Sequence, residues 1–235
     1  MKEVEAIVLA GGSGARMGEH TLDKQKCLLP IEDKPILGRI IDGLVVAFGS
    51  VDLKIAIGYK AEDVVDFVDR NKPKNVKVTY VPHEPGTEGW GIYREMRNYV
   101  RGEFVAMPGD ILVLPQIYES VLLQYVDNQV EGAMTLSPTI HEAKTHGVGL
   151  IENERVVDLK WPPPSSVEKG WLRDMTIWAS DTTFFDLIDR YQNPKKGIGH
   201  VFVDAIRDGV DIAGNYYGEP WIHLEKSTDL SRRLA

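Results

Sequence analysis

The sequence has little cysteine, fewer cations than acids and no long apolar run. Cys27 is its only cysteine, which excludes an internal disulfide and a cysteine cage for a metal and leads us to expect a reducing compartment, the cytoplasm. Its 27 Lys and Arg face 35 Asp and Glu, a net charge of −8 that argues against nucleic acid or an anionic membrane as partner. No stretch reaches the roughly 20 apolar residues that span a bilayer, and residues 6–10 are too short a run for a signal peptide.

The first half of the chain alternates strand and helix patterns. Apolar runs predict strands over residues 5–10, 51–58, 76–81 and 103–107. Apolar residues at the helical period predict helices over residues 35–48, 61–70, 91–100 and 115–126. This rotation predicts an α/β fold, a Rossmann-like three-layer α/β/α arrangement around a mostly parallel mixed sheet.

The second half is less regular. Its patterns predict strands over residues 132–137, 147–151, 156–161, 175–180 and 221–224, and helices over 184–191, 200–207 and 228–234. Residues 152–154 are expected to form a hairpin turn. We expect one domain over residues 1–235, with one half over residues 1–115 and a second over residues 116–235.

A glycine-rich loop follows the first predicted strand. The loop, residues 9–14, is Leu9, Ala10, Gly11, Gly12, Ser13 and Gly14. In a doubly wound sheet ligands bind at the carboxyl ends of strands, and glycines let backbone N–H groups approach an anion. The dinucleotide fingerprint fails because Met17 stands at its third glycine, which disfavours a nicotinamide-dependent reductase; the P-loop pattern fails for want of Gly-Lys-Ser/Thr.

The loop belongs to a longer compound motif. It continues through Arg16 and Met17 to Gln25-Lys26-Cys27-Leu28-Leu29-Pro30-Ile31 and Lys34-Pro35-Ile36-Leu37. This motif resembles the signature of the nucleotide-sugar pyrophosphorylases, or sugar-1-phosphate nucleotidylyltransferases. The resemblance implies a nucleoside triphosphate and a sugar-1-phosphate as substrates, Mg²⁺ as cofactor, nucleotide contacts from residues 9–14, and Arg16 and Lys26 as catalytic cations. It also implies that Gly86 and Thr87 contact the base.

The resemblance places the metal at two distant segments. Asp110, which closes the strand of residues 103–107 in a Gly-Asp pair, matches the family's Mg²⁺ ligand. In the C-terminal segment His223 stands where the family has an acidic residue, while Glu225 shares its face on strand alternation, so both remain candidates for the second ligand. Asp229 is expected to be structural.

The sugar-phosphate contacts rest on a more degraded match. Lys160 keeps the position of the family's sugar-phosphate lysine, although Leu159 replaces the preceding glutamate, and Gly147 is expected to line the sugar pocket. Residues 176–178 depart from the family's Gly-Ile-Tyr. Gln25 replaces the family's proline, which we expect to loosen the backbone before Lys26.

The motifs together predict an enzyme. An oxygen of the sugar-1-phosphate would attack the α-phosphorus of the triphosphate and release pyrophosphate; since this nucleophile is already an anion, no general base is needed. Two alternatives remain: a catalytically weak regulatory protein that binds nucleotide sugars, and a nucleotidyltransferase acting on a non-sugar alcohol phosphate. The sequence leaves the base, the sugar and a homo-oligomeric state open.

Overall fold

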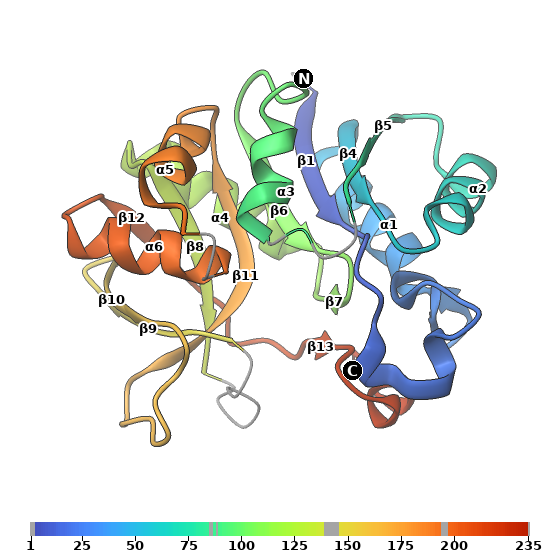
Figure 1. Ribbon diagram of the computed structural model, residues 1–235. Helices are drawn as coiled ribbons and strands as arrows, with labels where there is room; N and C mark the ends of the chain where they lie inside the picture. The colour runs from blue at the N-terminus through green and yellow to red at the C-terminus, as the bar shows by residue number, and fades with distance from the viewer. Residues whose placement is uncertain (1–2, 85–86, 88, 139–145, 194–196, 235) are drawn as a thin grey trace. The chain divides into compact units, whose positions relative to one another are not determined.

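The computed structural model describes residues 3–84, 87, 89–138, 146–193 and 197–234 (Figure 1). The chain forms two compact units, and each unit consists of segments that are separate in the sequence. The first contains Met1–Thr87, Met107–Glu119 and Glu219–Ala235, and the second contains Glu88–Ala106 and Ser120–Gly218. The predicted halves were contiguous, whereas the chain returns to the first unit at its C-terminal end.

The first unit is built on a parallel sheet. Its strands β1 (Val4–Leu9), β4 (Val51–Ile57) and β5 (Val76–Pro82) lie side by side in the order β5-β4-β1. Helix α1 (Ile36–Phe48) precedes β4 and helix α2 (Ala61–Asn71) connects β4 to β5, as the apolar periods predict. Because the strands are parallel, the segments that follow them meet at one edge of the sheet (Figure 1).

Short elements complete the first unit. The segments η1 (Ala15–Thr21) and η2 (Lys26–Leu28) are 3₁₀ turns, and β2 (Pro30–Ile31) pairs with β3 (Lys34–Pro35). Strand β7 (Ile111–Leu112) pairs antiparallel with β13 (Ile222–His223). This pairing returns the C-terminal segment to the first unit.

The predicted terminal helix over residues 228–234 is wrong. The segment forms a 3₁₀ turn, η3 (Ser227–Ser231). The buried Asp229 carboxylate accepts hydrogen bonds from the backbone N–H groups of Glu225 and Lys226, both at 2.9 Å. These bonds confirm a structural role for Asp229. They join the turn to the residues directly before it, and the segment forms a short 3₁₀ turn where a longer helix was predicted.

The second unit holds a mainly antiparallel sheet. Its order is β6 (Phe104–Pro108), β11 (Leu172–Ser180), β8 (Gly132–Ser137), β12 (Ile212–Tyr216), β10 (Arg155–Lys160) and β9 (Val148–Glu152), and the last two residues of β6 belong to the first unit. Strands β8 and β12 are parallel, while β11 runs antiparallel to β6, β8 and β9. Pairing of β9 with β10 confirms the predicted hairpin turn. Strand β12 was not predicted.

Helices of the second unit pack through aromatic side chains. They are α3 (Gly89–Met96), α5 (Phe184–Tyr191) and α6 (Ile198–Arg207), while α4 (Gln116–Asn128) spans the boundary between the units. Trp178 of β11 makes edge contacts with Phe184 and Phe202, with ring centroids 4.2 and 4.7 Å apart. Among the helices of the described residues, none is long and apolar enough to cross a membrane.

Candidate functional site

The glycine-rich loop of residues 9–14 brings the backbone close to Lys26. Gly14 has a φ of +64°, in the left-handed region, and a Cβ added to it would lie 2.9 Å from the Cβ of Lys26. Any larger residue would therefore strain the loop and push the lysine stem away. The sequence predicted both parts of this contact, the loop and the lysine.

Gln25 ties the loop to the segment that carries Lys26. Its side-chain amide donates to the carbonyl oxygens of Ala10 (2.6 Å) and Gly12 (3.0 Å), and its Oε1 accepts from the backbone N–H of Cys27. The residue is 2% exposed, and its φ of −66° is the value that a proline would fix. The prediction that Gln25 loosens this backbone is therefore wrong, because it keeps the φ of proline and adds three side-chain hydrogen bonds, two of them buried.

Asp110 lies beside the loop and pairs with Lys26. The backbone N–H of Gly109 donates to the carbonyl oxygen of Leu9 at 2.8 Å, which fixes the Gly-Asp pair next to the end of β1. The Lys26 Nζ is 2.5 Å from the Asp110 Oδ2. The predicted meeting of the glycine loop, Lys26 and the mid-chain carboxylate is present in the first unit.

The C-terminal segment adds an imidazole and a second carboxylate. The backbone N–H of Leu224 donates to the Asp110 carbonyl oxygen at 2.9 Å. His223 Nε2 lies 3.5 Å from Asp110 Oδ2, and its Nδ1 lies 3.7 Å from Glu225 Oε1. Arg16 closes the series, with Nη1 2.9 Å from the same Glu225 oxygen. A series of basic and acidic side chains, called the charged series below, thus runs from Arg16 through Glu225, His223 and Asp110 to Lys26.

The electrostatics of this series favour an ionised carboxylate. Burial alone would raise the pKa of Asp110, but hydrogen bonding with His223 and the positive charge of Lys26 outweigh it and hold that pKa well below its usual range. Burial raises the pKa of the neighbouring Cys27 thiol far above its usual value, and the charge of Asp110 adds to this effect. Cys27 is therefore held as a thiol, unsuited to act as a nucleophile.

The donor set fits a hard divalent cation. Asp110 and Glu225 supply carboxylate oxygens from two segments, and their side chains are 22% and 15% exposed, so each is partly accessible. One or two carboxylates completed by substrate phosphates is the usual Mg²⁺ arrangement. His223 lies between the two carboxylates, and its imidazole suits softer metals.

The segment after β5 carries the predicted base contacts. Gly86 lies outside the described residues. The Thr87 hydroxyl donates to the Glu84 carbonyl oxygen at 2.7 Å, which closes a local turn. Sequence reasoning did not single out His83, whose buried Nε2 has no hydrogen-bond partner among the residues that the structure describes.

The second unit carries the predicted sugar-phosphate contacts. The exposed Lys160 places its Nζ 3.8 Å from the centroid of the Trp171 ring. A Cβ added to Gly147 would lie 2.9 Å from the Trp161 ring, and the Gly147 carbonyl oxygen accepts from the Asp174 N–H. Sequence reasoning missed Asp174, a buried carboxyl whose pKa burial raises to about 6.

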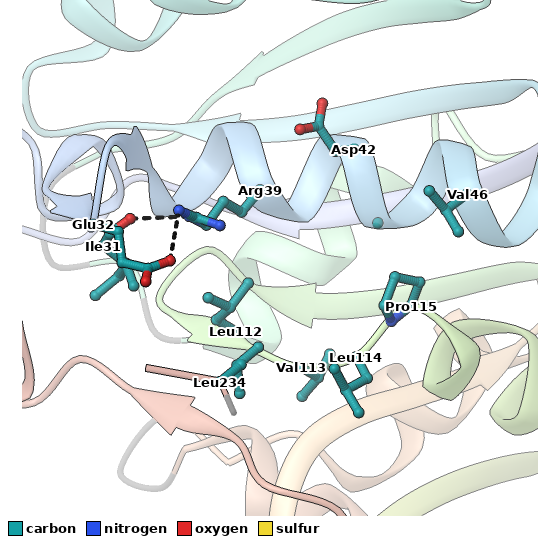
Figure 2. A pocket seen from close by; sticks show the side chains of 11 residues that line it. Ile31, Glu32, Arg39, Asp42, Val46, Leu112, Val113, Leu114, Pro115 and Leu234 are labelled. Carbon is teal, nitrogen blue, oxygen red and sulfur yellow. Dashed lines mark hydrogen bonds and ion pairs between the residues drawn. The ribbon is translucent and has the colours of Figure 1, made fainter. Parts of the chain in front are cut away.

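A separate pocket of the first unit lies between α1 and the segment after β7 (Figure 2). Arg39 at its rim pairs with Glu32 and Asp33, at 3.1 and 2.8 Å. Its apolar wall is formed by Leu112, Val113, Leu114, Pro115 and Leu234. The described residues that line this pocket include none of the charged series, so the pocket is distinct from the candidate site.

A glycine loop at the carboxyl edge of a parallel sheet, with cations and carboxylates beside it, defines an α/β protein of the nucleotide-diphospho-sugar transferase fold. The chain belongs to the MobA-like NTP transferase domain family, whose model matches residues 6–158. The predicted family resemblance and fold class are thereby confirmed.

The individual curated relatives share low sequence identity with this chain. The chain is 27% identical over 241 residues to the "Bifunctional protein GlmU" of Methanocaldococcus jannaschii, covering 98% of this chain and 55% of that protein. It is 27% identical over 169 residues to the "UTP--glucose-1-phosphate uridylyltransferase AglF" of Haloferax volcanii, covering 70% of this chain and 68% of that protein. The chain thus spans about half the length of the GlmU relatives.

Solved structures share the fold. A putative glucose-1-phosphate thymidylyltransferase from Bacillus anthracis superposes with a TM-score of 0.85 at 20% identity, covering 97% of this chain and 93% of that one. A UDP-glucose pyrophosphorylase crystallised with UDP-glucose gives a TM-score of 0.82 at 16% identity, with 97% and 96% coverage.

Proposed function

We propose that this protein transfers a nucleotidyl group from a nucleoside triphosphate to a sugar-1-phosphate, forming a nucleoside diphosphate sugar and releasing pyrophosphate. The observation that carries the proposal is the charged series from Arg16 to Lys26 beside the glycine loop. Membership of an NTP transferase family supports the donor, and the printed names of AglF and the thymidylyltransferase support the acceptor.

The residues present suit this reaction because it needs charge stabilisation and positioning more than proton transfer. A phosphate oxygen of the sugar-1-phosphate forms a bond to the α-phosphorus, and the bond from that phosphorus to the β-phosphate bridging oxygen breaks. Lys26 and Arg16 stabilise the negative charge of the triphosphate and of the leaving pyrophosphate. Backbone N–H groups of residues 9–14 contact the phosphates. Gly147 and Lys160 contact the sugar phosphate.

We include Mg²⁺ in the proposal, with Asp110 and Glu225 as the residues that would hold it and His223 as the remaining candidate. The metal would supply charge neutralisation for the phosphates and a template for their alignment. The low pKa of Asp110 suits this role, because the carboxylate needs no deprotonation near neutral pH. A cytoplasmic location, which rests on the single cysteine, is likewise a proposal.

The test is pyrophosphate release with a panel of the common nucleoside triphosphates against sugar-1-phosphates and alcohol phosphates, with and without Mg²⁺. We expect turnover with at least one sugar-1-phosphate, and a large loss in the Asp110→Asn variant. Asp42→Asn serves as the matched control, because Asp42 is an exposed residue of α1 that pairs with Lys34 of β3. Tight nucleotide-sugar binding without turnover across the panel would contradict the proposal and favour a regulatory protein. Turnover with alcohol phosphates alone would show that the acceptor is an alcohol phosphate and not a sugar-1-phosphate.

A further inference from the structure

Lys160 lies over the face of a tryptophan ring in the second unit. Its Nζ is 3.8 Å from the centroid of the Trp171 ring, a distance at which the negative face of an indole attracts an ammonium strongly. Lys160 is the last residue of β10 and is exposed, whereas Trp171 directly precedes β11 and is only 7% exposed. A buried ring thus contacts an exposed cation.

Packing fixes the position of the Trp171 ring. The ring forms a buried cluster with Val148, and the partly buried Leu150 and Val167 pack against this cluster. Val148 pairs with Lys160 of β10 on one side and with β11 on the other, so a single residue of β9 joins the two strands. The backbone of Lys160 is therefore held by strand pairing, and only its flexible side chain depends on a further contact.

The same strand ends hold Gly147, the other predicted sugar-phosphate contact. Gly147 directly precedes Val148, and a Cβ added to it would lie 3.1 Å from the Lys160 carbonyl oxygen. The Gly147 carbonyl oxygen accepts from the Asp174 N–H at 2.9 Å, which fixes the glycine against β11. Gly147 and Lys160 are therefore close neighbours in the folded chain, although 13 positions separate them in the sequence.

The indole holds the Lys160 ammonium without neutralising its charge. Among the residues that the structure describes, no carboxylate forms an ion pair with Lys160, whereas Lys26 and Arg16 of the charged series are both paired with carboxylates. A carboxylate would compete with a phosphate for the ammonium, because both are anions, whereas a ring face has no net charge. An ammonium has three N–H donors, and those directed away from the ring are available to an anion.

We propose that Trp171 is a positioning residue for the acceptor substrate: its ring holds the Lys160 ammonium where the N–H groups meet the phosphate of the sugar-1-phosphate. The inference rests on the proposed function, in which Lys160 contacts this phosphate. A lysine side chain loses rotamer freedom when it binds a phosphate. The ring lowers that cost, because it restricts the side chain before the acceptor binds.

The kinetic test is a double-mutant cycle with the sugar-1-phosphate that gives the highest turnover. Trp171→Leu should raise the KM for this acceptor about 2–5-fold, and Trp171→Phe, whose ring attracts a cation less strongly, should raise it less. Lys160→Met keeps the apolar stem and should raise the same KM on the order of 10–100-fold. Added to Lys160→Met, Trp171→Leu should have no further effect. The KM for the triphosphate should stay unchanged in every variant.

Lys60→Met is the matched control, because Lys60 also lies over a ring, that of Tyr59 at 5.7 Å, but belongs to none of the proposed substrate contacts. Its KM values should equal those of the wild type. An unchanged acceptor KM in Trp171→Leu would overturn the inference. An equal rise with and without Lys160→Met would overturn it as well, because the ring would then act only by packing the strands.

A second measurement needs no turnover. The side-chain protons of Lys160, assigned by their loss in Lys160→Met, should give NMR signals that the ring current of Trp171 shifts upfield. Titration with inorganic phosphate should move these signals in the wild type. Signals at the positions of an ordinary exposed lysine would show that the ring does not hold the ammonium and would overturn the inference.

Failures of the two proposals are distinguishable. Upfield Lys160 signals that respond to phosphate, without pyrophosphate release for any acceptor, would overturn the proposed function and support the positioning role. Pyrophosphate release with additive effects of Trp171→Leu and Lys160→Met would overturn the positioning role alone. Absence of pyrophosphate release together with Lys160 signals of an ordinary exposed lysine would overturn both.

Discussion

Replacement of Gln25 by glutamate isolates the buried amide that connects the glycine loop to Lys26. The two side chains have the same shape, so Gln25→Glu keeps the acceptor for the Cys27 N–H, removes the amide donor and places a carboxyl group in its stead. The carbonyl oxygens of Ala10 and Gly12 would then face a carboxylate oxygen in place of an N–H. Gln25 and Ala10 are each 2% exposed, so water cannot supply the bond that joins them.

The expected magnitude follows from those two lost bonds. The buried Ala10 carbonyl left without its donor costs about 1–3 kcal/mol, whereas water can reach the carbonyl of the exposed Gly12, so we expect the free energy of unfolding to fall by about 1–3 kcal/mol. A domain of ordinary stability has only about 5–15 kcal/mol in total. We also expect weaker triphosphate binding, because the loop and Lys26 lose their shared support.

Urea unfolding followed by circular dichroism, together with triphosphate binding, measures both effects. Gln116→Glu at the exposed start of α4 is the control, and it should change stability by less than about 0.5 kcal/mol. Gln25→Pro is a second probe, because the native φ of −66° already suits proline and no backbone strain is introduced. If both Gln25 variants unfold with the wild-type free energy, the amide does not hold the loop and the reasoning is refuted.

Three other variants test the remaining parts of the structure. Lys26→Ala should lower kcat for pyrophosphate release by about 10²–10³, as for one oxyanion donor, and an unchanged kcat would remove the lysine from the mechanism. The pKa of Asp174 is raised to about 6, so the folded state binds its proton more tightly than the unfolded chain and stability falls as pH rises from about 4 through 6. Asp174→Asn should therefore gain up to about 3 kcal/mol at pH 7.5 in urea unfolding and nothing at pH 4; equal effects at both pH values would contradict this. Lys54→Ala should lower the free energy of unfolding by about 3–5 kcal/mol in the same assay, because the buried ammonium lies 2.8 Å from a carboxylate oxygen of both Glu5 and Asp52. A decrease below about 1 kcal/mol would mean that water takes the place of the ammonium and would contradict this prediction.

The sequence by itself determined the elements whose signal is local. The apolar periods gave α1 and the parallel strands of the first unit, because burial of one helix face or of a whole strand leaves a regular pattern in nearby residues. The loop of residues 9–14 and the Lys26 that follows it also lie within one short stretch. Their resemblance to the family's compound motif was enough to predict the family, while the phosphate contacts stay a prediction.

Local patterns misled where short segments took their conformation from distant partners. The apolar positions of residues 228–234 suggested a helix, but the carboxylate of Asp229 bonds back to the preceding backbone and leaves a 3₁₀ turn. The sequence suggested that Gln25 only loses the rigidity of the family's proline. Its real contacts were not visible there, because the carbonyl groups that accept from its amide lie 13 and 15 residues earlier.

Tertiary structure alone decided how the charges of the site are paired. Arg16 meets Glu225 across 209 residues of chain, and Lys26 meets Asp110 across 84. The Arg16–Glu225 contact depends on the return of the C-terminal segment to β7, which no nearby pattern encodes. A sequence shows which groups are available, whereas their separation in space and their access to water are set by packing between segments remote along the chain.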